Sequence, residues 1–120
     1  MINILEYSDI TFPEDFLWGA STAGQQIEGN NNSFYDDKEI APKFAYGGVP
    51  YQMAGRACNS YEMYKEDIAL LKKMHLNSYR MSLEWSRIEP VEGQFDEKEI
   101  EHYRDVLKEL KKNNIKVCLT

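Results

Sequence analysis

Two kinds of pattern alternate along this chain: short apolar runs, and longer segments in which apolar residues recur at helical spacing. The apolar runs cover residues 16–20, 78–83 and 115–120, and their length predicts strands. Helical spacing characterises the segments that begin near Asn59 and Asp96. The order is therefore strand, long loop, helix, strand, helix, strand. Such alternation predicts an α/β fold with right-handed crossovers and a parallel sheet.

The first helical segment has an apolar face and clear end signals. Asn59, with Glu62 three positions later, predicts a capping box at its start. His75 stands where the helix should end, and histidine is among the non-glycine residues that tolerate a left-handed backbone there. The face expected to pack in the core consists of Tyr61, Tyr64, Ile68 and Leu71.

The second helical segment has the same organisation. Asp96 and Glu99 predict another capping box, and Asn114 is suited to end the helix in a left-handed conformation. Its expected core face consists of Ile100, Tyr103, Leu107 and Leu110.

Charge and cysteine content narrow the choice of partners. The net charge of −6 argues against nucleic acid or an anionic membrane surface as a partner. No apolar run approaches the roughly 20 residues needed to span a bilayer, and no signal peptide is apparent. Cys58 and Cys118 lack metal or redox spacing, and Cys118, inside an apolar run, is predicted to be a buried free thiol. These features predict a protein of the reducing cytoplasm.

Polar side chains follow the first two predicted strands, where a parallel α/β barrel builds its active site. Gln26 offers an amide donor and acceptor suited to two neighbouring sugar hydroxyls, or else it caps a loop. Arg80 lies in an apolar context and needs an anionic or carbonyl partner. Arg80 either pairs with Glu84 on its own strand face or faces the centre of a barrel and holds a catalytic carboxylate.

Three carboxylates, Glu28, Glu84 and Glu89, are candidates for acid/base chemistry. Retaining glycoside hydrolysis needs two carboxyl groups about 5–5.5 Å apart, and nothing in their spacing shows such a pair. The long segment 29–57 lacks periodicity, and long loops are usually functional or mobile. Its aromatic residues either stack on sugar rings or cover a core; they include Phe34, Tyr35, Phe44, Tyr46 and Tyr51.

Taken together, several motifs resemble glycoside hydrolase family 1, the β-glucosidase, β-galactosidase and 6-phospho-β-glycosidase family. The resemblance runs from about Phe12 to Thr120, essentially the whole chain. The matching motifs are residues 12–23, 26–29, 57–61, 64–68, 79–82 and 84–88. Several motifs in the right order and spacing make the resemblance highly specific.

The resemblance implies a (β/α)₈ TIM barrel and a retaining double-displacement mechanism without metal or cofactor. Gln26 would bind the glycone hydroxyls, and Arg80 would orient the nucleophile and help keep it ionised, because a nearby cation favours the charged carboxylate. Ser82, Trp85 and Arg87 would support the second strand. Residues 1–120 would then form the N-terminal part of one barrel domain, about the first two and a half βα units.

One departure from the family pattern decides what activity we expect of this chain. The Asn-Glu-Pro and Glu-Asn-Gly motifs, which hold the family's acid/base and nucleophile, do not occur here. The sequence is therefore expected to be roughly the first quarter of a cytoplasmic β-glycosidase acting on β-linked glucosides or galactosides, 6-phosphorylated or not, and to be inactive alone. Open strand edges predict self-association. The rival hypothesis is a small non-enzymatic module that binds sugar or scaffolds a partner.

Overall fold

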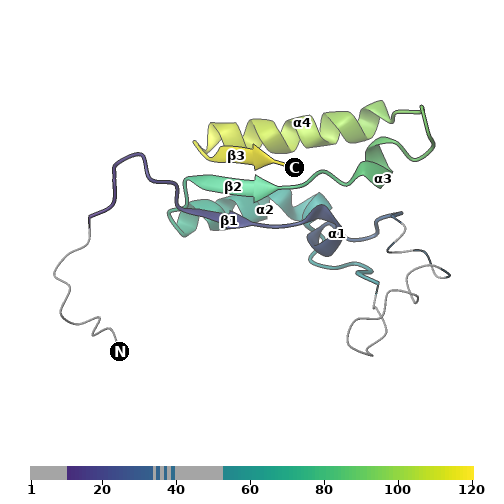
Figure 1. Ribbon diagram of the computed structural model, residues 1–120, viewed down its shortest axis with the longest axis horizontal. Helices are drawn as coiled ribbons and strands as arrows, with labels where there is room; N and C mark the ends of the chain where they lie inside the picture. Colours follow the sequence, from purple (N-terminus) through teal and green to yellow (C-terminus); the bar gives the residue numbers. More distant parts are fainter. Residues whose placement is uncertain (1–10, 34, 36, 38, 40–52) are drawn as a thin grey trace.

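The computed structural model describes residues 11–33, 35, 37, 39 and 53–120. Within them, three parallel strands form one sheet in the order β1-β2-β3 (Figure 1). The strands are β1 (Gly19–Ser21), β2 (Ser78–Met81) and β3 (Lys116–Leu119). The predicted α/β class and the parallel pairing are confirmed.

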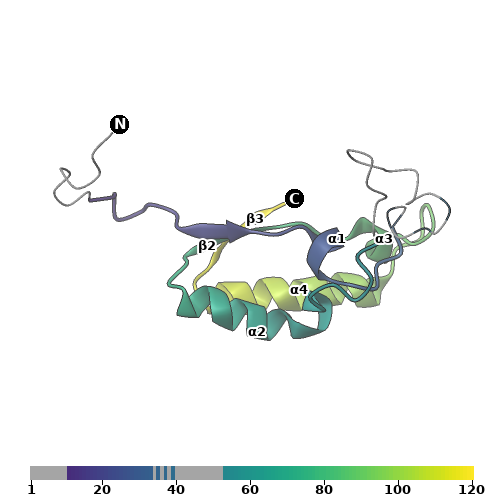
Figure 2. The same cartoon turned by 90° about the horizontal axis from the view of Figure 1, so that it is seen from below.

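Two long helices, α2 (Ser60–Lys73) and α4 (Glu97–Lys112), cover one face of the sheet (Figure 2). The core between these layers is one cluster of buried side chains: Ile68, Met81, Val106, Leu110 and Ile115. Leu110 of α4 is fully buried at its centre. The predicted faces of both helices are largely confirmed, although α4 buries Val106 rather than Ile100.

Two short helices follow the carboxyl ends of the first two strands. Helix α1 (Gly24–Ile27) comes directly after β1, and α3 (Trp85–Ile88) comes after β2 (Figure 1). The sequence pattern does not predict either of them, because four residues are too few to show a helical period.

Helix ends agree with the predictions in three of four cases. The Asp96 carboxylate accepts from the backbone N–H groups of Lys98 and Glu99, and caps α4. The other half of the predicted capping box is not formed, because the Asp96 N–H donates to the carbonyl of Ile88. His75 and Asn114 both adopt positive φ, at 58° each. The capping box at Asn59 is wrong: this residue is itself left-handed, with φ 56°, and its side chain makes no capping hydrogen bond.

The first apolar run is only partly a strand, and it is not buried. Strand β1 begins at Gly19, and the aromatic side chains before it are exposed. Phe12, Phe16 and Trp18 pack against one another, with ring centroids 4.7–4.8 Å apart. Trp18 is tied to the sheet through Asn77, whose side-chain oxygen accepts from the Trp18 N–H at 2.8 Å. Within this chain the aromatic side chains of the run therefore pack on one another and are not buried between the sheet and the helices.

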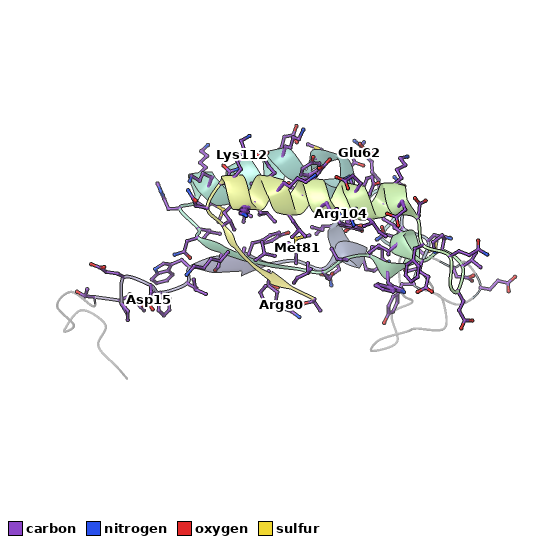
Figure 3. All side chains as sticks on the ribbon, turned by 90° about the horizontal axis from the view of Figure 1, so that it is seen from above. Asp15, Glu62, Arg80, Met81, Arg104 and Lys112 are labelled. Carbon is purple, nitrogen blue, oxygen red and sulfur yellow. The ribbon has the colours of Figure 1, made fainter. Side chains whose placement is uncertain are left out.

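The other face of the sheet is bare among the described residues. Ser21, Arg80 and Cys118 are register partners on β1, β2 and β3, and all three are exposed. Figure 3 shows Arg80 on the side of the sheet away from the helices and Met81 between the sheet and α4. The prediction of a buried Cys118 is wrong, because strand alternation places it beside Arg80 on this bare face.

Candidate functional site

The candidate site lies where β1 and β2 end, because hydrogen bonds hold their following segments together. The backbone N–H of Thr22 donates to the carbonyl of Arg80 at 3.0 Å, which continues the strand pairing past β1. The N–H of Gly24, the first residue of α1, donates to Ser82 Oγ at 2.7 Å. The turn that carries Gln26 is therefore anchored to the segment just beyond Arg80.

Gln26 lies in α1 and is exposed. Its backbone N–H donates to the carbonyl of Ala23, and its side chain forms no hydrogen bond to any described residue. A capping role for this amide therefore has no support in the described part of the chain. The side chain is accessible to a ligand at the carboxyl edge of the sheet.

Arg80 lies on the bare face of β2, and its only described side-chain partner is Ser21 Oγ at 3.5 Å. Glu84 does not pair with it; instead Glu84 Oε1 accepts from the N–H and the hydroxyl of Ser86 and caps α3. Among residues 11–33 and 53–120, no carboxylate forms an ion pair with this guanidinium. The interpretation in which Arg80 and Glu84 form a structural pair is therefore wrong.

Glu28 is buried immediately behind this edge and holds two elements together. Its carboxylate accepts from Arg87 Nε at 3.1 Å and from the Tyr103 hydroxyl at 2.9 and 3.1 Å. Its side chain is 8% exposed and that of Arg87 is 16% exposed. The Tyr103 hydroxyl also accepts from the Glu84 N–H, so one tyrosine joins the segments that follow β1 and β2.

Electrostatic effects in this cluster follow from its burial. Removal from water raises the pKa of Glu28, and the Tyr103 hydrogen bond and the charge of Arg87 offset part of that rise. Burial and the neighbouring Glu28 carboxylate raise the pKa of Tyr103. Tyr103 therefore stays protonated and donates to the carboxylate throughout the physiological pH range.

Arg87 extends the cluster toward the helices. Its Nη2 donates to the carbonyl of Gly29 at 2.6 Å, and its Cζ lies 4.1 Å from the centroid of the Tyr61 ring. Tyr61 in turn stacks on His102 and donates to Glu99, and burial together with Glu99 raises the pKa of Tyr61 to about 12. Arg87 therefore joins α3 to the segment after β1 and to α2, and its predicted role in supporting the second strand stays a prediction.

Glu89, the third candidate carboxylate, is held by its own turn. It accepts from Trp85 Nε1 and from the backbone N–H of Gly93, both at 2.7 Å. Glu28, Glu84 and Glu89 thus each accept hydrogen bonds from described residues, and each has a structural role there.

An open hollow of about 360 Å³ lies beside α1 and α3. Volumes of this size are typical of small-molecule sites. Tyr35 lines it, whereas Phe34, Phe44, Tyr46 and Tyr51 lie outside the described residues. The described residues that line it are Gln25, Asn32, Ser33, Tyr35, Glu84, Trp85 and Ser86.

Two absences apply to the described part of the chain only. It contains no group of three His, Cys, Asp or Glu side chains that could hold a metal ion. Nor does it contain a helix that is long and apolar enough to cross a membrane.

Sequence reasoning missed Tyr103 as a partner of the candidate site. The periodicity of α4 placed Tyr103 on the core face, which is correct, but a buried tyrosine hydroxyl also needs a hydrogen-bond partner. That requirement was the available signal, although it could not identify Glu28 across 75 positions of sequence.

The fold and the site define a class: a parallel α/β protein with polar residues gathered at the carboxyl edge of its sheet. Residues 8–120 match the sequence profile described as glycosyl hydrolase family 1. The chain belongs to this family.

Relatives and solved structures agree with that assignment. Beta-glucosidase A of Acetivibrio thermocellus is 37% identical, covering 94% of this chain and 26% of that protein. Myrosinase 1 of Brevicoryne brassicae is 38% identical over a match that covers 89% of this chain and 24% of that protein. The crystal structure of the AHE enzyme from Alicyclobacillus herbarius matches with a TM-score of 0.79 at 34% identity, covering 94% of this chain and 26% of that one. A β-glycosidase from Pyrococcus horikoshii matches with a TM-score of 0.76 at 35% identity, covering 90% and 24%. The chain therefore spans about a quarter of the length of the relatives that it matches.

Proposed function

We propose that this chain is the N-terminal part of a retaining β-glycosidase and forms about the first two and a half βα units of a (β/α)₈ barrel. Family membership and the β-glucosidase relatives support the reaction class. The observation that carries the proposal is the position of Arg80. It is an exposed guanidinium on a bare sheet face, with no carboxylate partner among the described residues. A barrel interior with a nucleophilic carboxylate would supply that partner.

In this proposal the two site residues have distinct tasks. Gln26 binds glycone hydroxyls through its amide, which donates and accepts at once. Arg80 orients the nucleophile and keeps it ionised, because the adjacent cation lowers the energy of the carboxylate. The nucleophile and the acid/base glutamate are supplied by other parts of the barrel, and the mechanism needs no metal or cofactor.

Activity assays test the proposal directly. The full-length protein should hydrolyse nitrophenyl β-glucoside with retention of the anomeric configuration, whereas the 120-residue chain should show no turnover. Turnover by the 120-residue chain would contradict the assignment of both catalytic carboxylates to other parts of the protein. Absence of hydrolysis by the full-length protein, together with measurable sugar binding by the short chain, would favour a non-enzymatic module.

The substrate class within this proposal is an unphosphorylated β-glucoside or β-galactoside. By the family resemblance, Ile27 supports this choice, since phospho-specific members of the family often have Cys or Tyr at that position. Rates on glucoside, galactoside and 6-phosphoglucoside substrates decide the matter. A preference for the 6-phosphoglucoside would contradict the choice.

The 120-residue chain alone should associate with itself. The bare face of the sheet and the outer edges of β1 and β3 leave backbone and side-chain groups without a protein partner in the described region. Light scattering over a range of concentrations should show a rising average mass, and a constant monomer mass would contradict this expectation.

A further inference from the structure

The segments that follow β1 and β2 meet in one buried cluster of side chains. Glu28 is the residue that ends α1, two positions after Gln26. Tyr103 bonds both Glu28 and the Glu84 N–H, and Glu84 begins the short helix after β2. The cluster therefore joins the turn that carries Gln26 to the strand that carries Arg80.

The packing around Glu28 leaves little freedom for that turn. A Cβ at Gly24 would lie 2.9 Å from Glu28 Oε1 and 3.3 Å from the Ser82 carbonyl oxygen, so a larger residue there would displace the Glu28 carboxylate. Gly29, directly after Glu28, has φ of 79° and its carbonyl accepts from Arg87 Nη2. Glycines and hydrogen bonds thus fix the backbone on both sides of Glu28.

We propose that Glu28, Arg87 and Tyr103 are positioning residues, which set where Gln26 presents its amide to the sugar relative to Arg80. The inference rests on the proposed function and adds to it the residues on which the sugar contact depends. None of the three touches the substrate; they act through α1. A misplacement of about 1 Å in such a contact reduces a rate on the order of 100-fold.

The geometry indicates which substitution is informative. Glu28→Gln keeps the shape of the side chain but leaves one carbonyl oxygen to accept from both Arg87 Nε and the Tyr103 hydroxyl. Tyr103→Phe removes the hydroxyl alone and serves as a second variant if the first fails to fold. Glu101→Gln is the matched control, since Glu101 lies on the exposed face of α4 and its ion pairs within the described residues are with Arg104 and Lys108.

The test measures kcat/KM of the full-length protein on nitrophenyl β-glucoside and on its monodeoxy analogues. In the unsubstituted protein, an analogue that lacks the hydroxyl contacted by Gln26 should have a much lower kcat/KM than the parent glycoside, because the amide is then left unpaired. Gln26→Ala should abolish that penalty. Glu28→Gln and Tyr103→Phe should each reduce this penalty, the ratio of kcat/KM between the parent glycoside and the deoxy analogue, at least tenfold. They should leave the ratios for the other deoxy analogues unchanged. Glu101→Gln should leave all of these ratios unchanged.

The outcomes separate the two proposals. An equal loss on every substrate in Glu28→Gln and Tyr103→Phe would show a merely structural role and overturn the positioning inference. If the unsubstituted full-length protein hydrolyses none of these glycosides, the proposed function fails instead. Hydrogen exchange of residues 24–28 in the same variants then decides the positioning inference. Protection lost only in that segment supports it, and unchanged protection overturns it.

Discussion

The two faces of the three-stranded sheet differ in burial and in their contact with the helices. On the covered face, Met81 is buried against α4, and Tyr79 and Val117 pack on the same core. On the opposite face, the row Ser21, Arg80 and Cys118 is exposed. Both faces come from the same strands, since successive side chains point to opposite sides. The covered face stabilises this chain, and the bare face carries the residue predicted to take part in catalysis.

The carboxyl edge joins the two faces. Buried Glu28 and Tyr103 belong energetically to the covered side, yet they hold the turn that presents Gln26. Because stability and proposed function meet in this cluster, substitutions should affect folding less and sugar recognition more as they move from the core through the cluster to the bare face.

The largest effect is expected from Leu110→Ala. Leu110 is fully buried, and its truncation should lower the free energy of unfolding by about 2–5 kcal/mol through lost burial and a cavity. Urea titration followed by circular dichroism measures the change. Leu119→Ala is the matched control, because Leu119 is 48% exposed on edge strand β3. Equal losses in the two variants would contradict the description of the covered core.

Tyr103→Phe should have the next largest effect. It leaves the Glu84 N–H without its acceptor and the Glu28 carboxylate without one donor, at a cost of about 1–3 kcal/mol in unfolding free energy. Tyr64→Phe is the control in the same aromatic region, since the Tyr64 hydroxyl bonds no described residue, and its effect should be within about 0.5 kcal/mol. A neutral Tyr103→Phe would show that the cluster contributes little to folding.

The covered face was more predictable from sequence than the cluster. Periodicity identified Ile68 and Leu110 as core residues because burial repeats at helical spacing. The exposed aromatic cluster at Phe12, Phe16 and Trp18 defeated the same reasoning, since an apolar run can pack on itself without entering a layer.

The candidate site was predictable only in part. Arg80 on the bare face follows from strand alternation, and the family resemblance supplied the role predicted for it. The Glu28–Tyr103 contact spans 75 positions of sequence and depends on the tertiary fold that brings the residue after α1 to a side chain of α4, which no local pattern encodes. The roles of Gln26 and Arg80 in catalysis stay predictions.

The pH dependence of the unfolding free energy tests how Glu28 contributes to the buried cluster. The pKa of Glu28 is raised by burial, so the folded state holds its proton more tightly than the unfolded state does. Its contribution to stability is full below the ordinary value of 4.5 and is lost as pH rises through the raised pKa. Unfolding free energies of the unsubstituted chain should therefore decline relative to Glu28→Gln as pH increases above 4.5.

Glu101 gives a control of opposite sign for that titration. Hydrogen bonds from Lys108 and Arg104 lower the pKa of Glu101, so its contribution is present above the ordinary value and is lost as pH falls. Because this carboxylate is exposed, the effect of Glu101→Gln should be small. A decline with rising pH that is the same in the unsubstituted chain and in Glu28→Gln would remove Glu28 as its source.

The smallest effect on folding is expected from Arg80→Ala, on the bare face. Arg80 is exposed and contacts Ser21 only at 3.5 Å, so the unfolding free energy of the 120-residue chain should change by less than about 0.5 kcal/mol. If Arg80 has its proposed role, the same substitution in the full-length protein should reduce kcat strongly, because the nucleophile would lose the cation that orients it. Arg80→Lys keeps the charge without the planar fork and should recover only part of the rate. A large loss of folding stability in the short chain would place Arg80 among the structural residues, and full activity in Arg80→Ala would remove it from the catalytic site.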